Sequence, residues 1–275
     1  MPNPWDNYPE YMILGVPVRA MRMSDVVRAA ESVISGAGGA AADRHMHIGV
    51  VNAAKVVNMR RDAALREAVL TSDLILADGI AVVWASRALG TPLPERVAGI
   101  DLMTRLLELA DRRKLRVYLF GATEDVNAKM AEEIARCWPG AVVAGRRNGY
   151  YAADEEEAIA RQIGDSRSDL LFVAMSPPKK EIFLARWGAV MRVPVSHGVG
   201  GAFDVVAGKV KRAPAGWQKL GLEWLYRVVQ EPRRMWRRYL TTNTAFAWML
   251  AGAWVRKRFG GGERGSPTSA RVSQS

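Results

Sequence analysis

Asp78 is the residue whose position in this sequence most clearly allows chemistry. It follows the apolar run Leu74–Ala77 and precedes a glycine, within the stretch LADGIAVV. The apolar run and the helical pattern after it indicate a strand-to-helix turn, where aspartate commonly serves as a helix N-cap. A carboxylate at the ligand-binding edge of a sheet can also act as a general base. The local sequence allows both roles, so both stay open at this point.

Three further stretches carry groups that can bind phosphate. Arg96, in LPERVAGIDL, has a planar fork of donors that suits phosphate, although an arginine in a Pro/Gly loop is usually only solvated. In MSPPKKE, Lys179 and Lys180 either belong to a helix start or face a phosphate. In HGVGGAFD, Gly200 and Gly201 either form a structural turn or expose backbone N–H groups that cradle a diphosphate.

Metal and cofactor chemistry has little support in the sequence. The chain has one cysteine and three histidines, and no two aspartates stand in a D-x-D arrangement. His45 and His47 share a face if they lie on a strand, but two polar strand-edge residues are the simpler interpretation. The stretch GAGGAAAD has the spacing of a dinucleotide fingerprint, but a helix precedes it and a strand follows, which reverses the required order. We interpret it as a flexible linker and expect no metal and no cofactor.

The elements that must position these groups alternate along the first 200 residues. Continuous apolar strands separated by helices predict an α/β fold with a mostly parallel, Rossmann-like sheet flanked by helices. Ligands of such sheets bind beyond the carboxyl ends of the strands, where Asp78 and the glycine-rich stretch both fall. The predicted strands are His47–Val51, Leu74–Ala77, Val117–Phe120, Ala141–Ala144, Leu170–Ala174 and Val193–His197. The predicted helices are Asp62–Leu70, Ile80–Leu89, Asp101–Lys114, Asp125–Cys137, Asp154–Ile163 and Lys180–Ala189.

The pattern changes after about residue 210. Apolar residues recur at helical spacing from Trp217 to Val228, Pro232 interrupts, and two further helical stretches follow, RRMWRRYL and NTAFAWMLAGAWVRKRF. We therefore predict a core over residues 1–210, a basic amphipathic helical appendage over 211–259, and a disordered Gly/Ser-rich tail over 260–275.

The net charge of +11 and a sequence pI of about 10.1 favour anionic partners: nucleic acid, phosphorylated small molecules or an anionic membrane surface. The charge is concentrated toward the C-terminus, because Glu223 and Glu231 are the only acids between Lys209 and Arg258. The sequence shows no signal peptide and no apolar run near the roughly 20 residues that span a bilayer. A single cysteine fits a reducing compartment.

Taken together, these stretches resemble the WecG/TagA/CpsF glycosyltransferase family, also called glycosyltransferase family 26. The matching stretches run in the family's order from about residue 12 to 240. They are VNAAKVV, ADGIAVV, PERVAGIDL, LFGA, NGYY, VAMSPPKKEIF, GVGGAFDVVAGKVKRAP and LGLEWLYRVVQEPRRMWRRYL.

The resemblance implies an inverting glycosyltransferase that acts peripherally at the cytoplasmic face of the inner (plasma) membrane. Such an enzyme moves N-acetylmannosamine, its uronic acid or a related hexose from a UDP-sugar to a polyprenyl-diphosphate-linked acceptor. The products feed cell-surface polysaccharide synthesis. A homo-oligomer is left open, and no nucleic acid partner is expected.

The resemblance also implies roles for individual residues. Asp78 matches the family's catalytic base, Arg96 an active-site arginine, and Asn52 the asparagine of a T-x-N sugar-pocket motif. The arginines of the appendage that match family arginines thought to contact phosphates are Arg227, Arg234 and Arg237.

Two residues depart from the family pattern. Val50 replaces the threonine of T-x-N, and Lys180 replaces the glutamine of P-K-Q-E. Lys180 keeps a donor and adds charge, which suggests the hypothesis that it favours an acidic donor such as a UDP-uronic acid. With these departures, a non-catalytic membrane-associated scaffold that binds nucleotide-sugars is an alternative function.

Two other classes share single features of the chain. A nucleic-acid-binding module would use the same positive charge, but the sequence has no helix-turn-helix, RNA-recognition or zinc-finger signature. A nicotinamide oxidoreductase would share the sheet, but the sequence lacks a correctly placed glycine fingerprint.

Overall fold

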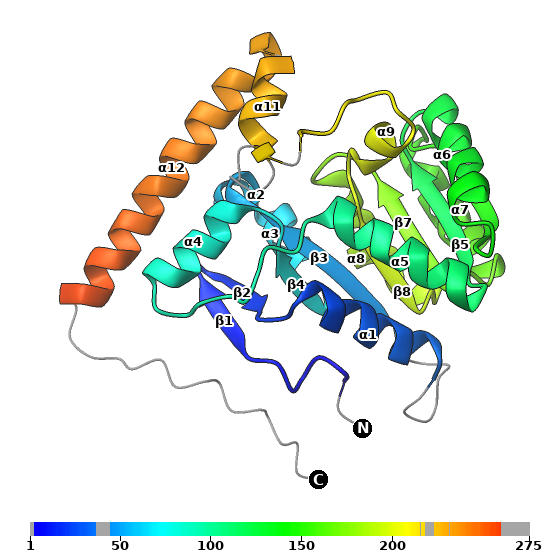
Figure 1. Ribbon diagram of the computed structural model, residues 1–275, viewed down its shortest axis with the longest axis horizontal. Helices are drawn as coiled ribbons and strands as arrows, with labels where there is room; N and C mark the ends of the chain where they lie inside the picture. Colours follow the sequence, from blue (N-terminus) through cyan, green and yellow to red (C-terminus); the bar gives the residue numbers. More distant parts are fainter. Residues whose placement is uncertain (1–2, 37–44, 215, 218–222, 231, 260–275) are drawn as a thin grey trace.

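The centre of the fold is a six-stranded sheet in the order β4-β3-β8-β7-β5-β6, with every neighbouring pair parallel (Figure 1). The computed structural model describes residues 3–36, 45–214, 216–217, 223–230 and 232–259. The predicted α/β fold is confirmed, and all six predicted strands form within a few residues of their expected bounds. The strands are β3 (Met46–Val51), β4 (Leu74–Ala77), β5 (Arg116–Gly121), β6 (Val142–Arg147), β7 (Leu170–Ala174) and β8 (Val195–Gly198).

Helices cover both faces of the sheet (Figure 1). Neighbouring residues of β5 show this, since Leu119 packs in the apolar cluster under α1, α5 and α6, while Phe120 packs in the cluster with α7 and α8. Burial on both faces is why these strands read as continuous apolar runs. The helices are α1 (Met23–Ile34), α2 (Ala53–Asn58), α3 (Ala63–Leu70), α4 (Ile80–Ala88), α5 (Gly99–Arg113), α6 (Glu124–Cys137), α7 (Glu156–Asp165), α8 (Lys179–Met191) and α9 (Ala202–Val206).

The strand order places a topological switch point between β3 and β8. From β3 the chain crosses to β4 on one side, and β5 to β8 then lie on the other side. Ligands of open parallel sheets bind beyond the carboxyl ends of the strands at such a point. Asn52 follows β3, Asp78 follows β4, and Gly200 and Gly201 follow β8. The topology therefore brings four of the predicted site residues to one edge of the sheet.

The appendage consists of α11 (Glu223–Gln230) and α12 (Pro232–Phe259). The sequence predicted two helical stretches after Pro232, but they form one helix of 28 residues. Pro232 does mark a boundary, because it occupies the first position of α12, where its missing N–H costs nothing. Figure 1 shows α12 lying beside α2 and α4. Phe246 is buried there, in the apolar cluster that also includes the short antiparallel hairpin of β1 (Glu10–Ile13) and β2 (Val16–Arg19).

Within the described residues, no helix has both the length and the apolar character needed to cross a membrane. The predicted flexible linker at residues 36–43 falls outside the described residues except for Gly36, and the predicted tail at 260–275 lies wholly outside them. The division between core and appendage at residue 210 stays a prediction.

Candidate active site

Asp78 caps a helix, but not the helix that the sequence suggested. The N-cap of α4 is Gly79, with no side-chain hydrogen bond. The Oδ1 atom of Asp78 instead accepts a hydrogen bond of 3.0 Å from the backbone N–H of Gly99, the first residue of α5. The positive end of a helix dipole favours a carboxylate at this place. No described residue donates a hydrogen bond to Oδ2, so this oxygen can act on a substrate proton.

The peptide of Gly99 also faces His197, a fully buried residue of β8. The two ring nitrogens of His197 lie 3.1 Å from the carbonyl oxygens of Ile48 and Gly99. Burial lowers the pKa of His197, against the opposing effects of these two carbonyls and of the Asp78 carboxylate. The first turn of α5 is therefore held by Asp78 through its N–H and contacts β8 through its carbonyl.

Asn52 lies next to the Asp78–Gly79 turn. Its Oδ1 atom accepts a hydrogen bond from the backbone N–H of Lys55 at 3.0 Å and so caps α2. A Cβ atom at position 79 would lie only 3.0 Å from the Cβ of Asn52. Glycine at position 79 thus lets the ends of β3 and β4 approach closely, and the predicted sugar-pocket residue sits beside the predicted base.

Lys180 belongs to a buried ionic cluster with Lys55 and Glu181. Both ammonium groups lie 2.7 Å from the same oxygen, Oε1 of Glu181, and all three side chains are less than 10% exposed. The second oxygen, Oε2, is buried and has no hydrogen-bond partner among the described residues. The Lys180 side chain runs along the end of β8, where a Cβ at Gly198 would lie 3.2 Å from its carbons.

The cluster shifts the pKa values of Lys180 and Glu181. Burial, and then the Lys55 ammonium, lower the pKa of Lys180 to about 8, against the opposing effects of Glu181 and Asp78. Burial raises the pKa of Glu181, but the two ammonium groups outweigh it and leave this pKa below its usual value. Counting Asp78, two cations here face two carboxylates.

His45 and His47 differ in environment, and only His47 lies on β3, because this strand begins at Met46. His47 is buried, which corrects its interpretation as a polar strand-edge residue; burial and then His197 lower its pKa to about 3. His45 is exposed and lies 3.7 Å from Asp73. Nowhere in the described part of the chain do three or more potential metal ligands gather.

Arg96 connects the sheet edge to the appendage. Its neighbour Val97 donates a backbone hydrogen bond of 2.9 Å to Ala77, the residue before Asp78. The Nη1 atom of Arg96 lies 2.6 Å from Oε2 of Glu223, the first residue of α11. The loop that carries Arg96 is thus anchored beside Asp78, and its guanidinium is paired with the appendage.

The remaining predicted residues are placed by their backbone. Gly200 has a φ of +56°, a conformation that favours glycine, and Gly201 is the N-cap of α9. Arg227 lies on α11, whereas Arg234 and Arg237 lie in the first two turns of α12. The side chains of these three arginines fall outside the described residues, so their contacts with phosphate stay predictions.

Sequence reasoning missed four residues that shape the site: Lys55, Glu181, Arg212 and Glu223. Glu181 stands in the stretch MSPPKKE and Arg212 in GVGGAFDVVAGKVKRAP. Each has one partner distant in sequence, Lys55 for Glu181 and Asp101 for Arg212. Glu181 and Glu223 could have been singled out from the sequence, because each is an isolated negative charge among basic residues.

A parallel sheet with a carboxylate and an arginine beyond its carboxyl edge is the arrangement of an α/β enzyme. The chain belongs to the glycosyl transferase WecG/TagA/CpsF family, whose model matches residues 11–260. The protein is therefore a glycosyltransferase.

Two bacterial relatives bear the name N-acetylglucosaminyldiphosphoundecaprenol N-acetyl-beta-D-mannosaminyltransferase. The one from Bacillus spizizenii is 43% identical over 176 residues, which are 64% of this chain and 67% of the relative. The one from Bacillus subtilis is 39% identical over 171 residues, which are 62% of this chain and 66% of the relative. The matches thus span about two thirds of each relative.

Proposed function

We propose that this protein transfers a sugar, with inversion, from a UDP-sugar to a polyprenyl-diphosphate-linked acceptor in cell-surface polysaccharide synthesis. The observation that carries the proposal is the Asp78 carboxylate, which accepts a hydrogen bond from the start of α5 at the carboxyl edge of the sheet. The names of the two relatives support an N-acetylmannosaminyl donor and an N-acetylglucosaminyl-diphospholipid acceptor.

In the proposed reaction, Asp78 removes the proton of an acceptor hydroxyl as its oxygen attacks the anomeric carbon of the donor. The bond from that carbon to the diphosphate breaks, and the leaving UDP takes the electron pair. Arg96 and the backbone N–H groups around Gly200 and Gly201 are suited to stabilise this charge. Asn52 and Lys180 lie at the same sheet edge and line the place of the donor sugar.

Lys180 bears on the choice of donor. Its ammonium is paired with Glu181, and Lys55 shares the same oxygen. A donor carboxylate would therefore compete with Glu181 for Lys180. Oε2 of Glu181 is buried and has no partner among the described residues, so a neutral sugar could donate a hydroxyl or amide hydrogen to it once a shift of the cluster exposes it. An acidic donor stays a hypothesis, and the buried cluster supports a neutral one equally.

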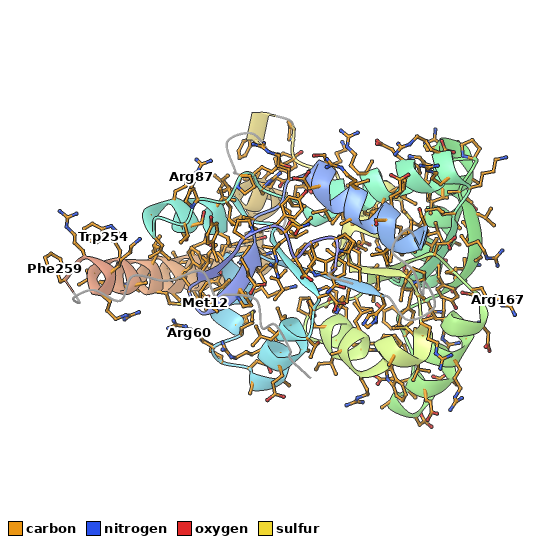
Figure 2. All side chains as sticks on the ribbon, turned by 90° about the horizontal axis from the view of Figure 1, so that it is seen from below. Met12, Arg60, Arg87, Arg167, Trp254 and Phe259 are labelled. Atoms are coloured by element: carbon orange, nitrogen blue, oxygen red, sulfur yellow. The ribbon has the colours of Figure 1, made fainter. Side chains whose placement is uncertain are left out.

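The appendage supports a peripheral position at the cytoplasmic face of the membrane. Figure 2 shows Trp254 and Phe259 at the outer end of α12, away from the sheet. Basic residues 256–258 stand in its last turn, and each contributes on the order of 1 kcal/mol near an anionic surface. The large apolar side chains exposed on the two helices are Val229, Trp236, Leu240, Trp248, Trp254, Val255 and Phe259.

The substitution Asp78→Asn tests the function. Asparagine keeps an oxygen that can accept the Gly99 N–H, but it cannot take a proton, so we expect turnover to fall by at least about 100-fold. UDP release would be measured with a synthetic polyprenyl-diphosphate monosaccharide. Asp62→Asn is the matched control, because Asp62 likewise caps a helix, α3, by accepting from Leu65 at 2.9 Å.

Near-normal turnover of Asp78→Asn would overturn the assignment of the base. A wild-type protein that binds UDP-sugars but releases no UDP with any acceptor would favour the alternative, a non-catalytic membrane-associated scaffold.

A further inference from the structure

Three segments of the chain meet at the carboxylate of Glu223. Arg96 comes from the loop before α5, Arg212 from the segment after α9, and Glu223 begins α11. The Nη1 atom of Arg96 lies 2.6 Å from Oε2 of Glu223, and the Nε atom of Arg212 lies 3.6 Å from Oε1. One carboxylate thus has an arginine at each oxygen.

Two of the three guanidinium nitrogens of Arg212 lack an acceptor among the described residues. Its Nη1 atom pairs with Oδ1 of Asp101 at 2.7 Å. Its Nε and Nη2 atoms are buried and have no hydrogen-bond partner among the described residues, since 3.6 Å to Glu223 exceeds hydrogen-bond length. Buried charged donors without acceptors are costly. Arg212 is therefore short of at least one anionic acceptor in this arrangement.

The charges around the two arginines balance only because Glu223 is present. Arg96 and Arg212 are opposed by Asp101 and Glu223. If Glu223 moved away with α11, the two guanidiniums would carry one charge more than Asp101. A diphosphate carries more charge and more acceptor oxygens than a carboxylate, and the planar arginine fork suits it well.

The location of this pair fits a substrate site. Asp101 stands in the first turn of α5, the same turn whose first N–H is held by Asp78. The positive end of this 15-residue helix adds to the attraction for an anion. An anion between Arg96 and Arg212 would thus lie close to the proposed base.

We propose that Arg96 and Arg212 form a diphosphate-binding site, and that Glu223 occupies it as an internal stand-in which a substrate diphosphate displaces. The proposal rests on the proposed function, because both the donor and the lipid-linked acceptor carry a diphosphate. It assigns a binding role to Arg212 and a competing role to Glu223. Displacement of Glu223 releases the start of α11, so binding of the diphosphate is coupled to the position of the appendage.

Binding of UDP to the full chain, measured by calorimetry without acceptor or lipid, is the first arm of the test. Arg212→Gln removes the charged donors, and we expect the dissociation constant to rise about ten-fold or more. Glu223→Gln removes the competing charge, and we expect tighter binding, by about three-fold or more. Arg105→Gln is the matched control, because Arg105 lies on α5 in an exposed pair with Glu108.

The second arm measures the KM of a short-chain prenyl-diphosphate sugar acceptor for the same variants. A change in UDP affinity alone assigns the site to the donor, and a change in acceptor KM alone assigns it to the lipid diphosphate. Should Arg212→Gln fail to fold by circular dichroism, Arg212→Lys keeps the charge without the fork and is expected to weaken binding several-fold.

Two results would overturn the proposal. The first is that the Arg212 variants match Arg105→Gln both in UDP affinity and in acceptor KM. The second is that Glu223→Gln binds UDP more weakly than the wild type. These readouts are separate from the test of the base. If the protein transfers no sugar yet Glu223→Gln tightens UDP binding, the proposed function fails and the diphosphate site stands.

Discussion

Glu181 is the residue whose replacement should most disturb the stability of this protein. One of its two carboxylate oxygens, Oε1, pairs with two buried ammonium groups, those of Lys55 and Lys180, each 2.7 Å away. Glu181→Gln keeps the shape but removes the carboxylate with which both ammonium groups pair, and leaves only Asp78 to oppose two cations. Breaking a buried ion pair by removing one partner costs about 3–5 kcal/mol. At roughly 2–4 °C per kcal/mol for a chain of this size, the melting temperature should fall by about 10 °C.

The loss should depend on pH. The folded-state pKa of Lys180, about 8, lies below the ordinary lysine value of 10.5. The unfolded chain therefore binds more protons between these values, and the contribution of this group to stability rises with pH across that window. Because Lys180 is largely neutral in the wild type above pH 8, loss of Glu181 removes less there. The deficit of Glu181→Gln should be largest below pH 8 and smaller near pH 10.

Lys55→Met should leave the stability of the protein nearly unchanged or raise it. It leaves one ammonium, Lys180, on one carboxylate, and it removes the charge that helps to lower the pKa of Lys180. Replacing a buried charge with an apolar side chain of similar volume is often neutral or stabilising. We expect the free energy of unfolding of Lys55→Met to lie within about 1 kcal/mol of the wild-type value or above it, in contrast to that of Glu181→Gln.

Urea unfolding followed by circular dichroism at pH 7 and pH 10 is the assay for these variants. The matched control is Glu157→Gln, because Glu157 pairs with Arg161 on the exposed side of α7 and should change stability by less than about 0.5 kcal/mol. If Glu181→Gln destabilises the protein no more than the control does, or if its loss of stability grows with pH, then Glu181 does not neutralise the two ammonium groups in this way.

Three further predictions concern other parts of the fold. Gly121→Ala should destabilise strongly, because its φ is +113° and a Cβ would lie 2.4 Å from a backbone oxygen; Gly188→Ala, in a helix with open space around it, should stabilise by about 0.5–1 kcal/mol in the same unfolding assay. Replacing exposed Trp248 and Trp254 by serine should reduce co-sedimentation with anionic vesicles without lowering the melting temperature. Lys180→Gln should shift the ratio of kcat/KM between neutral and acidic UDP-sugars toward the neutral one, and an unchanged ratio would reject a role in donor choice.

The central sheet could be predicted from the sequence, whereas the edge hairpin could not. β7, Leu170–Ala174, is buried at every residue and reads as a plain apolar run. The hairpin of β1 and β2 is short and half exposed, and Pro17 lies within its second strand, a position that argues against a strand unless it stands at an edge. The sequence predicts two helices where the structure has the single helix α12, because polar residues interrupt the apolar pattern although the helix continues through them.

The chemical groups at the strand ends could also be predicted, but their partners could not. Asp78 and Asn52 follow apolar strands, and parallel strands bring such positions to one edge. Lys55 and Glu181 stand 126 residues apart, and Arg96 and Glu223 stand 127 apart. No local period links residues at such separations, so a single sequence contains no sign of these pairs. The ionic environment of the site depends on them nonetheless.

The hydrogen bond of the proposed base could not be predicted from the residues next to it in the sequence. An aspartate directly before α4 suggests a cap for that helix, but the Val97 N–H bonds to Ala77 and brings the start of α5 to the end of β4. Asp78 therefore holds Gly99, 21 residues later, and the same short segment carries Arg96. One loop thus aligns both the proposed base and the arginine. Asparagine at position 78 keeps this hydrogen bond to Gly99, whereas alanine loses it. If both variants are inactive but the asparagine variant keeps the fold, the loss of activity in that variant comes from proton transfer and not from the orientation of the loop.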